Sequence, residues 1–148
     1  GLGSWLGFGK SLSTDVPKQK RSQFVAKSSL TRTVSAEDIQ NQSYTLIDAR
    51  AVERFRGEVE PIDTKAGHIP DALCRPYEAN LSTDGKFDTQ SSQFAALSDD
   101  LDVVCYCGSG VSATQNIMAI LLAGLPEPAL YPGSWSEWIQ NPARPISP

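Results

Sequence analysis

The sequence predicts an α/β domain with a largely parallel sheet, and two observations lead to this prediction. Short apolar segments alternate with segments of helical periodicity over residues 44–140, which is typical of parallel strands joined by crossover helices. The length of 148 residues, 40% of them hydrophobic and 20% charged, suits one compact soluble domain. Functional loops in such a sheet follow the carboxyl ends of the strands, where both Asp48 and Cys107 stand.

The first elements lie before residue 56. Residues 1–34 mix Gly, Ser, Lys and Pro without a sustained period, so we expect a loop or linker there. Ser35, followed three residues later by Asp38, forms a capping box that predicts a short helix reaching about Gln42. Two elements are expected after it: a strand over residues 44–47 that ends at 48–50, and a helical turn over 52–55.

The remaining elements follow from punctuation and periodicity. Gly and Pro in residues 57–67 predict a loop, and small or apolar residues spaced by three and four predict a helix over 111–123. Gly124 and Pro126 are expected to end that helix. The other expected elements are, in order, a short strand over 72–75, a helix including 94–97, a buried strand over 102–106, a strand over 129–131 and a helix over 134–140.

Charge and hydropathy exclude two classes of partner. Residues 1–35 hold six Lys or Arg and one Asp, whereas the remainder holds seven Lys or Arg and sixteen Asp or Glu. The basic tract is short and lacks interleaved aromatic residues, so we expect a solvated linker and no nucleic-acid binding. The longest apolar stretch, residues 117–123, is too short to cross a bilayer, so no membrane segment is expected.

The three cysteines, Cys74, Cys105 and Cys107, indicate the redox setting. Cys105 and Cys107 belong to one expected strand, and we expect strand alternation to place them on opposite faces, unsuited to a mutual disulfide. Free thiols favour a reducing compartment, and without a secretory leader in the sequence we expect a cytoplasmic location. One histidine and no C-x-x-C pair predict no metal site.

Cys107 follows an apolar, β-branched segment and precedes a Gly/Ser loop that opens into the helix over 111–123. This order aims several backbone N–H groups at the sulfur near a helix N-terminus, where negative charge is favoured. We therefore predict that Cys107 is an activated nucleophile, the alternative being a small buried apolar residue. Cys105 is expected to be a core residue, with a redox role as the alternative.

Protein tyrosine phosphatases use a similar cradle, and their signature places a phosphate-binding arginine six residues after the cysteine. In this chain that position is Ala113, so the guanidinium that would clamp a phosphate is missing. The sequence therefore argues against phosphatase chemistry.

The cysteine loop resembles the active-site loop of the rhodanese superfamily, in the form found in 3-mercaptopyruvate sulfurtransferases. The residues that carry this resemblance are Cys107, Gly108, Ser109, Gly110, Val111, Ser112 and Ala113, supported in order by residues 46–50, 54–57, 67–70 and 131–138. The resemblance implies a three-layer α/β fold, with a mostly parallel sheet flanked by helices. It also implies two tandem rhodanese domains, with the catalytic cysteine in the second.

An internal repeat fits this tandem organisation, because Gly3-Ser4-Trp5 recurs as Gly133-Ser134-Trp135. We accordingly expect residues 1–34 to be the tail of a preceding rhodanese domain (1–10) plus the linker (11–34), and residues 35–148 to be the catalytic domain. Since residue 1 is Gly, either a leader was removed or the chain begins inside a longer protein. The resemblance implies that the preceding domain contributes to the cleft, so the isolated fragment is expected to be weakly active.

The resemblance implies a sulfurtransferase that uses no cofactor. The Cys107 thiolate takes sulfur from 3-mercaptopyruvate, and the resulting persulfide passes it to an acceptor thiol, such as a thioredoxin, or to cyanide. The hydroxyls of Ser109 and Ser112 would position the donor, and Arg54 would bind its carboxylate, since a guanidinium matches two carboxylate oxygens. Structural roles are expected for the others: Asp48 capping its turn, Arg50 pairing with an acid, and His68 bonding backbone.

Two alternatives to this function remain open. A second carboxylate-binding arginine, common in mercaptopyruvate enzymes, is absent from residues 58–63, which leaves room for thiosulfate as the donor. Thiosulfate enzymes usually carry basic residues after the cysteine, where this chain has Gly108 and Ser109. Ser112 replaces a usual threonine and keeps its hydroxyl. The other alternative is a non-catalytic rhodanese module that carries sulfur or binds a partner.

Overall fold

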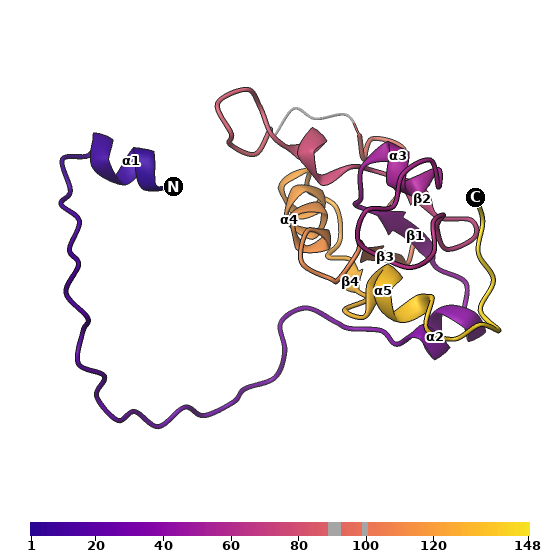
Figure 1. Ribbon diagram of the computed structural model, residues 1–148, viewed down its shortest axis with the longest axis horizontal. Helices are drawn as coiled ribbons and strands as arrows, with labels where there is room; N and C mark the ends of the chain where they lie inside the picture. The colour runs from indigo at the N-terminus through magenta and orange to yellow at the C-terminus, as the bar shows by residue number, and fades with distance from the viewer. Residues whose placement is uncertain (89–92, 99–100) are drawn as a thin grey trace.

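In the part of the chain that the structure describes, the central sheet has four strands that all run parallel (Figure 1). A computed structural model describes residues 1–88, 93–98 and 101–148. The strand order is β2-β1-β3-β4, and the strands are β1 (Thr45–Asp48), β2 (Leu73–Cys74), β3 (Val103–Tyr106) and β4 (Ala129–Leu130). In this register Asp48 lies opposite Tyr106 of β3 and Cys74 of β2, so the carboxyl ends of three strands meet at one edge. The expected parallel sheet is confirmed.

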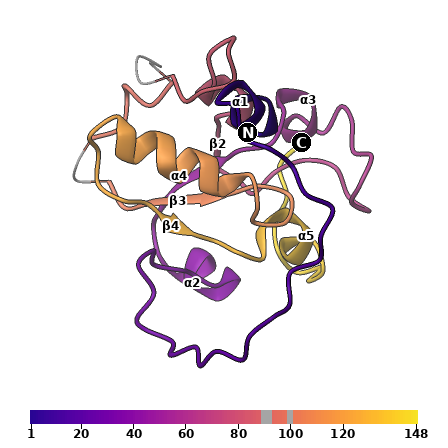
Figure 2. The ribbon, with the colours of Figure 1, turned by 90° about the vertical axis from the view of Figure 1, so that its left-hand side faces the viewer.

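Helices cover both faces of the sheet and complete the three layers. Figure 2 shows α4 above the strands, and α2 and α5 below them. The helices of the domain are α2 (Ala36–Asn41), α3 (Val52–Phe55), the 3-10 helix η1 (Tyr77–Asn80), α4 (Ala113–Leu122) and α5 (Ser134–Trp138). Alternate residues of the strands supply the two cores: Leu46 and Val104 pack toward α2 and α5, whereas Ile47 and Val103 pack toward α4.

Local signals explain where several of these elements begin and end. Ser35 caps α2 through a complete capping box with Asp38, as the sequence predicts. Gly124, with a φ of 81°, follows the end of α4. The helix α4 begins at Ala113, two residues later than expected, because Val111 and Ser112 belong to the turn before it.

Two expectations about local structure are wrong. Residues 94–97 form no helix: Leu97 N donates to Phe94 O in a single turn, while the carbonyl of Gln93 accepts a 2.7 Å hydrogen bond from Arg75 Nε. Cys105 and Cys107 pack on the same face of the sheet, in the core beneath α4. The reason is that residues two apart along a strand point the same way. All three cysteines are nonetheless free.

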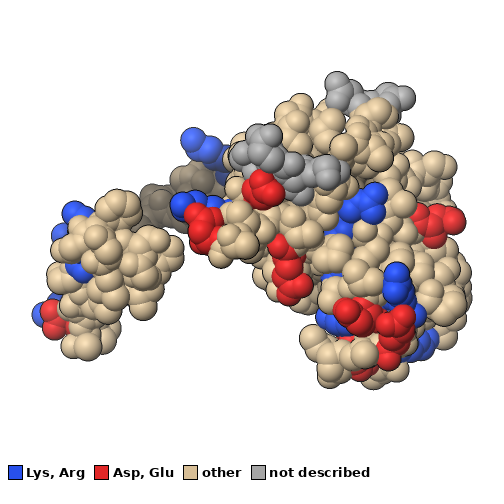
Figure 3. All heavy atoms as spheres, turned by 90° about the horizontal axis from the view of Figure 1, so that it is seen from above, with Lys and Arg blue, Asp and Glu red and all other residues tan. Residues whose placement is uncertain are grey.

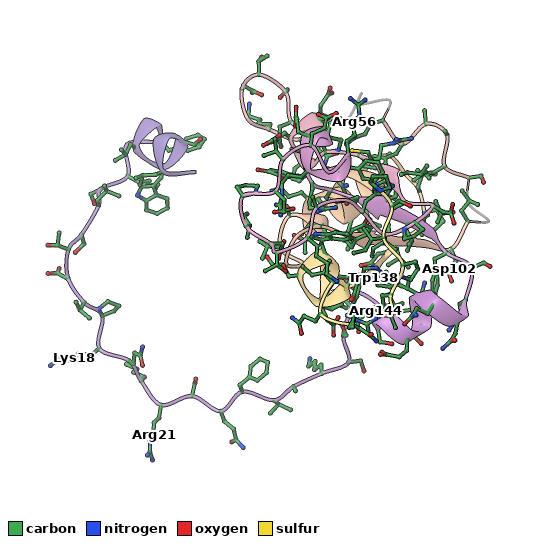
Figure 4. The ribbon with its side chains drawn as sticks, turned by 45° about the vertical axis from the view of Figure 1, so that its right-hand side comes forward. Lys18, Arg21, Arg56, Asp102, Trp138 and Arg144 are labelled. Atoms are coloured by element: carbon green, nitrogen blue, oxygen red, sulfur yellow. The ribbon has the colours of Figure 1, made fainter. Side chains whose placement is uncertain are left out.

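The N-terminal segment differs from the domain in burial. A short helix, α1 (Leu2–Gly7), was not expected from the sequence, and none of its residues is buried. Figure 4 shows Lys18 and Arg21 on the extended segment that follows, away from the folded domain. The chain reaches the sheet at Thr33, which bridges to Leu130 of β4, and the next residue, Val34, is buried. Among the described residues, no helix has both the length and the apolar character needed to cross a membrane.

Candidate active site

Cys107 follows β3 directly and lies at the carboxyl edge of the sheet. The backbone curls sharply after it, because Gly110 adopts a φ of 79° and approaches Pro132 closely. A Cβ added at Gly110 would lie 2.4 Å from the carbonyl oxygen of Pro132, so this position requires glycine. The turn brings the backbone between Cys107 and Ala113 around the sulfur.

The sulfur of Cys107 receives hydrogen bonds from this loop. Burial raises the pKa of its thiol, but the hydroxyl of Ser112 and the N–H groups of Ala113, Ser109 and Gly110 lower it more, so the net pKa falls below that of an ordinary thiol. Each of these donors stabilises the thiolate, the nucleophilic form of cysteine. The side chain of Ser112 therefore takes part in the cradle, whereas Ser109 contributes through its backbone.

The other two cysteines are in surroundings that favour the neutral thiol. Cys105 is fully buried, and burial raises the pKa of its thiol to about 12. Burial likewise raises the pKa of Cys74, on β2, with a further contribution from Asp48. Cys105 is thus a core residue, as expected, and Cys107 is the cysteine suited to nucleophilic attack.

Residues of the helix α5 form hydrogen bonds with the backbone of the cysteine loop. Cys107 N donates to Ser134 Oγ at 3.1 Å, and that hydroxyl donates to Tyr131 O at 2.9 Å. Trp135 N donates to Cys107 O at 3.0 Å, and Ser136 N donates to Gly108 O at 2.9 Å. These bonds fix the main chain of the loop and leave the sulfur facing the cavity.

A cavity of about 420 Å³ opens above the sulfur. Cys107 and Arg54 both line it, so the structure brings together the two residues to which the sequence assigns chemistry. The remaining lining residues are Arg50, Ala51, Ile62, Asp63, Tyr77, Glu78, Gly108, Ser109, Val111, Ser112 and Ser136. The volume accommodates a small organic anion next to the thiolate.

Arg54, on α3, lies between two carboxylates and the cysteine loop. Its Nη2 lies 2.6 Å from Glu60 Oε1 and 3.2 Å from Asp63 Oδ2. Its Nη1 reaches toward the loop, 3.5 Å from the position that a Cβ on Gly108 would occupy. The guanidinium therefore presents one edge to the loop while the acids bind the other.

Arg50 and Asp48 form a buried pair that supports the end of β1. Asp48 Oδ1 accepts a 2.9 Å hydrogen bond from Arg50 N, and Arg50 Nη2 lies 2.7 Å from Asp48 Oδ2. The same guanidinium donates to Gly67 O at 2.7 Å and lies over the ring of Trp135. These contacts correspond to the capping and pairing roles expected for the two residues.

His68 lies outside the residues that line the cavity. Its Nδ1 lies 2.7 Å from Phe55 O, and its ring stacks on that of Phe55 with centroids 3.7 Å apart. The backbone of His68 pairs with that of Ser147. His68 therefore joins α3 to the C-terminal segment, which fits the backbone contact expected for it.

Both the sequence and the fold of this chain are similar to those of known proteins. The sequence matches the Rhodanese-like domain family over residues 31–141. The chain belongs to the rhodanese family. Its fold agrees with that assignment, because a 3-mercaptopyruvate sulfurtransferase from Leishmania major superposes with a TM-score of 0.75 at 29% identity, over 95% of this chain and 42% of that one.

Curated relatives of this rhodanese domain carry both donor names. A probable 3-mercaptopyruvate sulfurtransferase of Pseudomonas aeruginosa is 43% identical over 99% of this chain and 55% of its own length. A putative thiosulfate sulfurtransferase, SseB, of Mycobacterium tuberculosis is 45% identical over 77% of this chain and 42% of its own length. The chain thus spans about half the length of these relatives.

Reasoning from the sequence alone assigned no role in the site to several residues that line the rhodanese cavity: Ala51, Ile62, Asp63, Tyr77, Glu78 and, beyond its place in the segment 131–138, Ser136. Tyr77 and Glu78 belong to η1, which carries no periodic signal. The acids of residues 58–63 were seen only as a segment without arginine, although Glu60 and Asp63 bind Arg54. The described residues hold no group of three or more His, Cys, Asp or Glu arranged for a metal ion.

Proposed function

We propose that this rhodanese domain transfers sulfur from 3-mercaptopyruvate to a thiol or cyanide through a persulfide on Cys107. The observation that carries the proposal is the position of Cys107: a thiol of lowered pKa in a cavity that also holds the Arg54 guanidinium. Such a cavity places a nucleophile beside a group that binds carboxylate. Relatives named for mercaptopyruvate and for thiosulfate support the same reaction class.

In the first half-reaction the Cys107 thiolate attacks the sulfur of the donor. An S–S bond forms, the C–S bond breaks, and its electron pair passes to the methylene carbon of the leaving enolate. That carbon takes the proton of the donor thiol, so pyruvate leaves and an anionic persulfide remains on Cys107. The N–H groups of Ser109, Gly110 and Ala113 that stabilise the thiolate also suit the persulfide anion.

In the second half-reaction an acceptor thiolate or cyanide attacks the outer sulfur. The S–S bond breaks, its electrons return to Cys107, and the acceptor leaves as a persulfide or as thiocyanate. Cys107 shares its cavity with the exposed Val111, so an acceptor from solution or from a protein such as a thioredoxin would reach the outer sulfur through this cavity. The thiolate is then ready for another donor.

Thiosulfate is the alternative donor, and it would leave as sulfite from the same persulfide. The name of the mycobacterial relative favours this alternative. The site favours mercaptopyruvate, because Gly108 and Ser109 follow the cysteine and Glu60 and Asp63 lie against Arg54. Comparing kcat/KM for the two donors tests the choice. A value for thiosulfate equal to or higher than that for mercaptopyruvate would contradict the mercaptopyruvate assignment.

A sulfur-carrier or interaction module without catalysis is the second alternative. A purely binding module has no physical need for a thiol of lowered pKa. Mass spectrometry after incubation with either donor separates sulfur transfer from a module that only binds a partner. Addition of one sulfur atom at Cys107, removed again by an acceptor thiol, supports catalysis, and a protein of unchanged mass supports the binding module.

The tandem organisation is part of the same proposal. The exposed helix α1, followed by an extended segment, supports residues 1–34 as the tail of a preceding rhodanese domain plus a linker, ahead of a catalytic domain at 35–148. The three free thiols fit a reducing compartment such as the cytoplasm. Extending the chain at its N-terminus and measuring turnover tests whether a preceding domain completes the cleft.

A further inference from the structure

The loop between α3 and β2 surrounds Arg54 with negative charge. Glu60 accepts hydrogen bonds from Arg54 at both oxygens, Oε1 from Nη2 at 2.6 Å and Oε2 from Nε at 3.2 Å. Asp63 Oδ2 accepts a third bond from Nη2 at 3.2 Å. Two carboxylates thus share the one guanidinium assigned to donor binding.

Glu60 is held firmly in the charged form. Its side chain is 5% exposed, and Oε1 also accepts from the N–H groups of Ile62 and Asp63 at 3.1 and 3.0 Å. Burial raises the pKa of Glu60, but the bonds from Arg54 and from these two N–H groups lower it more, so the pKa lies below its usual range. Glu60 is therefore ionised at neutral pH.

Asp63 is fixed from the opposite side of the cavity. Its Oδ1 accepts a 2.8 Å hydrogen bond from Ser136 Oγ on α5, while Oδ2 faces Arg54. Both oxygens are occupied, and the side chain is 10% exposed. The carboxylate cannot swing into solvent without losing both contacts, so its charge stays at the wall of the cavity.

The charges around the cavity do not favour a doubly charged anion. Among the described residues, its lining carries two guanidiniums, Arg50 and Arg54, and two carboxylates, Asp63 and Glu78. Glu60 contacts both guanidiniums, and Arg50 already pairs with Asp48. Carboxylates therefore outnumber guanidiniums here even before the Cys107 thiolate is counted. Repulsion from this excess grows in proportion to the charge of the donor.

We propose that Glu60 and Asp63 determine the choice of sulfur donor, because their charges offset that of Arg54 so that a singly charged carboxylate is accepted and doubly charged thiosulfate is disfavoured. This inference rests on the proposed sulfur transfer and assigns the two acids a role in it. They are specificity-determining residues that act through Arg54 and through the potential of the cavity, without attacking the donor.

Neutral isosteres test the proposal directly. Glu60→Gln and Asp63→Asn keep an oxygen for Arg54 but remove the charge, whereas Glu58→Gln is a control on the same loop, where Glu58 is exposed and faces Arg56. The measurement is the rate of sulfur loading on Cys107 by each donor in single-turnover mass spectrometry. We expect the ratio of thiosulfate to mercaptopyruvate rates to rise about tenfold in each test variant and to stay constant in the control.

A second measurement does not depend on sulfur transfer. Iodoacetate and iodoacetamide alkylate the same thiolate, but only iodoacetate is negatively charged. The ratio of the iodoacetate rate to the iodoacetamide rate therefore reports the electrostatic potential at Cys107. We expect this ratio to rise in Glu60→Gln and Asp63→Asn, and the difference from the parent chain to shrink in high salt. An unchanged iodoacetamide rate shows in addition that a variant has kept its fold.

The outcomes separate the selectivity proposal from the function beneath it. If the alkylation ratio rises but the donor ratio stays constant, the acids shape the potential without selecting the donor, and the proposal is overturned. If both donors lose rate in parallel, the acids merely hold Arg54 in place, and the proposal is again overturned. If neither donor loads the parent chain, the proposed sulfur transfer itself fails and the selectivity claim fails with it.

Discussion

The hydroxyl of Ser134 accepts a hydrogen bond from the backbone N–H of Cys107 at 3.1 Å. Ser134 is fully buried and has a φ of 53°, in the left-handed region that serine seldom adopts. A strained residue of a neighbouring helix thus holds the main chain of the nucleophile. The contact links the geometry of the site to the stability of the fold.

Replacing Ser134 should separate these two contributions. Ser134→Ala removes both hydroxyl bonds and leaves the buried Cys107 N–H unpaired, which should lower the free energy of unfolding by about 1–3 kcal/mol. Ser134→Gly removes the same bonds but relieves the positive φ, so it should be less destabilising than alanine. Urea unfolding measures both, and a glycine variant less stable than the alanine variant would contradict this account.

The two cysteines of the β3 region should differ sharply in function. Cys107→Ser should abolish sulfur loading, because a hydroxyl at this position remains protonated and is a weak nucleophile. Cys105→Ala should keep most of the loading, since Cys105 is buried in the core and its pKa is raised to about 12. Mass spectrometry with donor present measures both, and equal loss in the two variants would show that the nucleophile is misassigned.

The reactivity of Cys107 should extend to lower pH than that of an ordinary thiol. Its pKa is lowered on balance, so the thiolate persists at pH values where a free cysteine is protonated. Ser112→Ala should move the midpoint of the pH profile of alkylation upward, because the Ser112 hydroxyl bonds the sulfur. Ser109→Ala is the matched control, since Ser109 donates through its backbone. A shift of the same size in both variants would argue against the side-chain bond.

The curl of the loop should depend on Gly110 and tolerate change at Gly108. Gly110→Ala places a Cβ 2.4 Å from Pro132 O at a φ of 79°, so the loop must open, at a cost of at least about 1 kcal/mol. The thiol pKa should rise as the N–H groups turn away. In Gly108→Ala the added carbon meets only Arg54, at the ordinary distance of 3.5 Å. Alkylation profiles of the pair check this, with the Gly108 variant expected to stay close to the parent.

Arg54 should matter for donor binding more than for folding of the loop. Arg54→Lys keeps the positive charge but loses the planar fork, and it should raise the KM for mercaptopyruvate about tenfold with a smaller change in kcat. Arg56→Lys is the control, since Arg56 is exposed on the same turn (Figure 4). Steady-state kinetics measures both, and an unchanged KM in the Arg54 variant would remove this residue from the donor site.

Much of the fold follows from local sequence signals. The strands around Leu46 and Val104 were predicted because alternation and β-branching are local properties, and α2 because its capping box spans only four residues. The prediction of a helix over 94–97 was wrong because this segment is held by a long-range hydrogen bond from Arg75 to the carbonyl of Gln93, which no local pattern reveals. The prediction that Cys105 and Cys107 lie on opposite faces of the sheet was wrong because residues two apart along a strand share a face.

The candidate site was predictable where its chemistry uses adjacent residues. The cradle of Cys107 depends on the seven residues that follow β3. The acids around Arg54 were not predictable, because Glu60 and Asp63 resemble a solvated acidic run and their burial arises only when the loop folds back over α3. Charges on the face seen in Figure 3 are similarly mixed, with Lys and Arg among Asp and Glu, which no single stretch of sequence discloses.

The loop over 57–67 is fastened to α5 at two points, by Trp135 Nε1 on Lys65 O and by Ser136 Oγ on Asp63. The sulfur of Cys107, by contrast, is bonded by the Ser112 hydroxyl and by the main-chain N–H groups of Ser109, Gly110 and Ala113, which all belong to its own loop. Reactivity and donor choice thus belong to separately heritable stretches of the gene. Exchange of this one loop among related chains offers evolution, or an engineer, a way to change the sulfur source while the thiol chemistry is inherited intact.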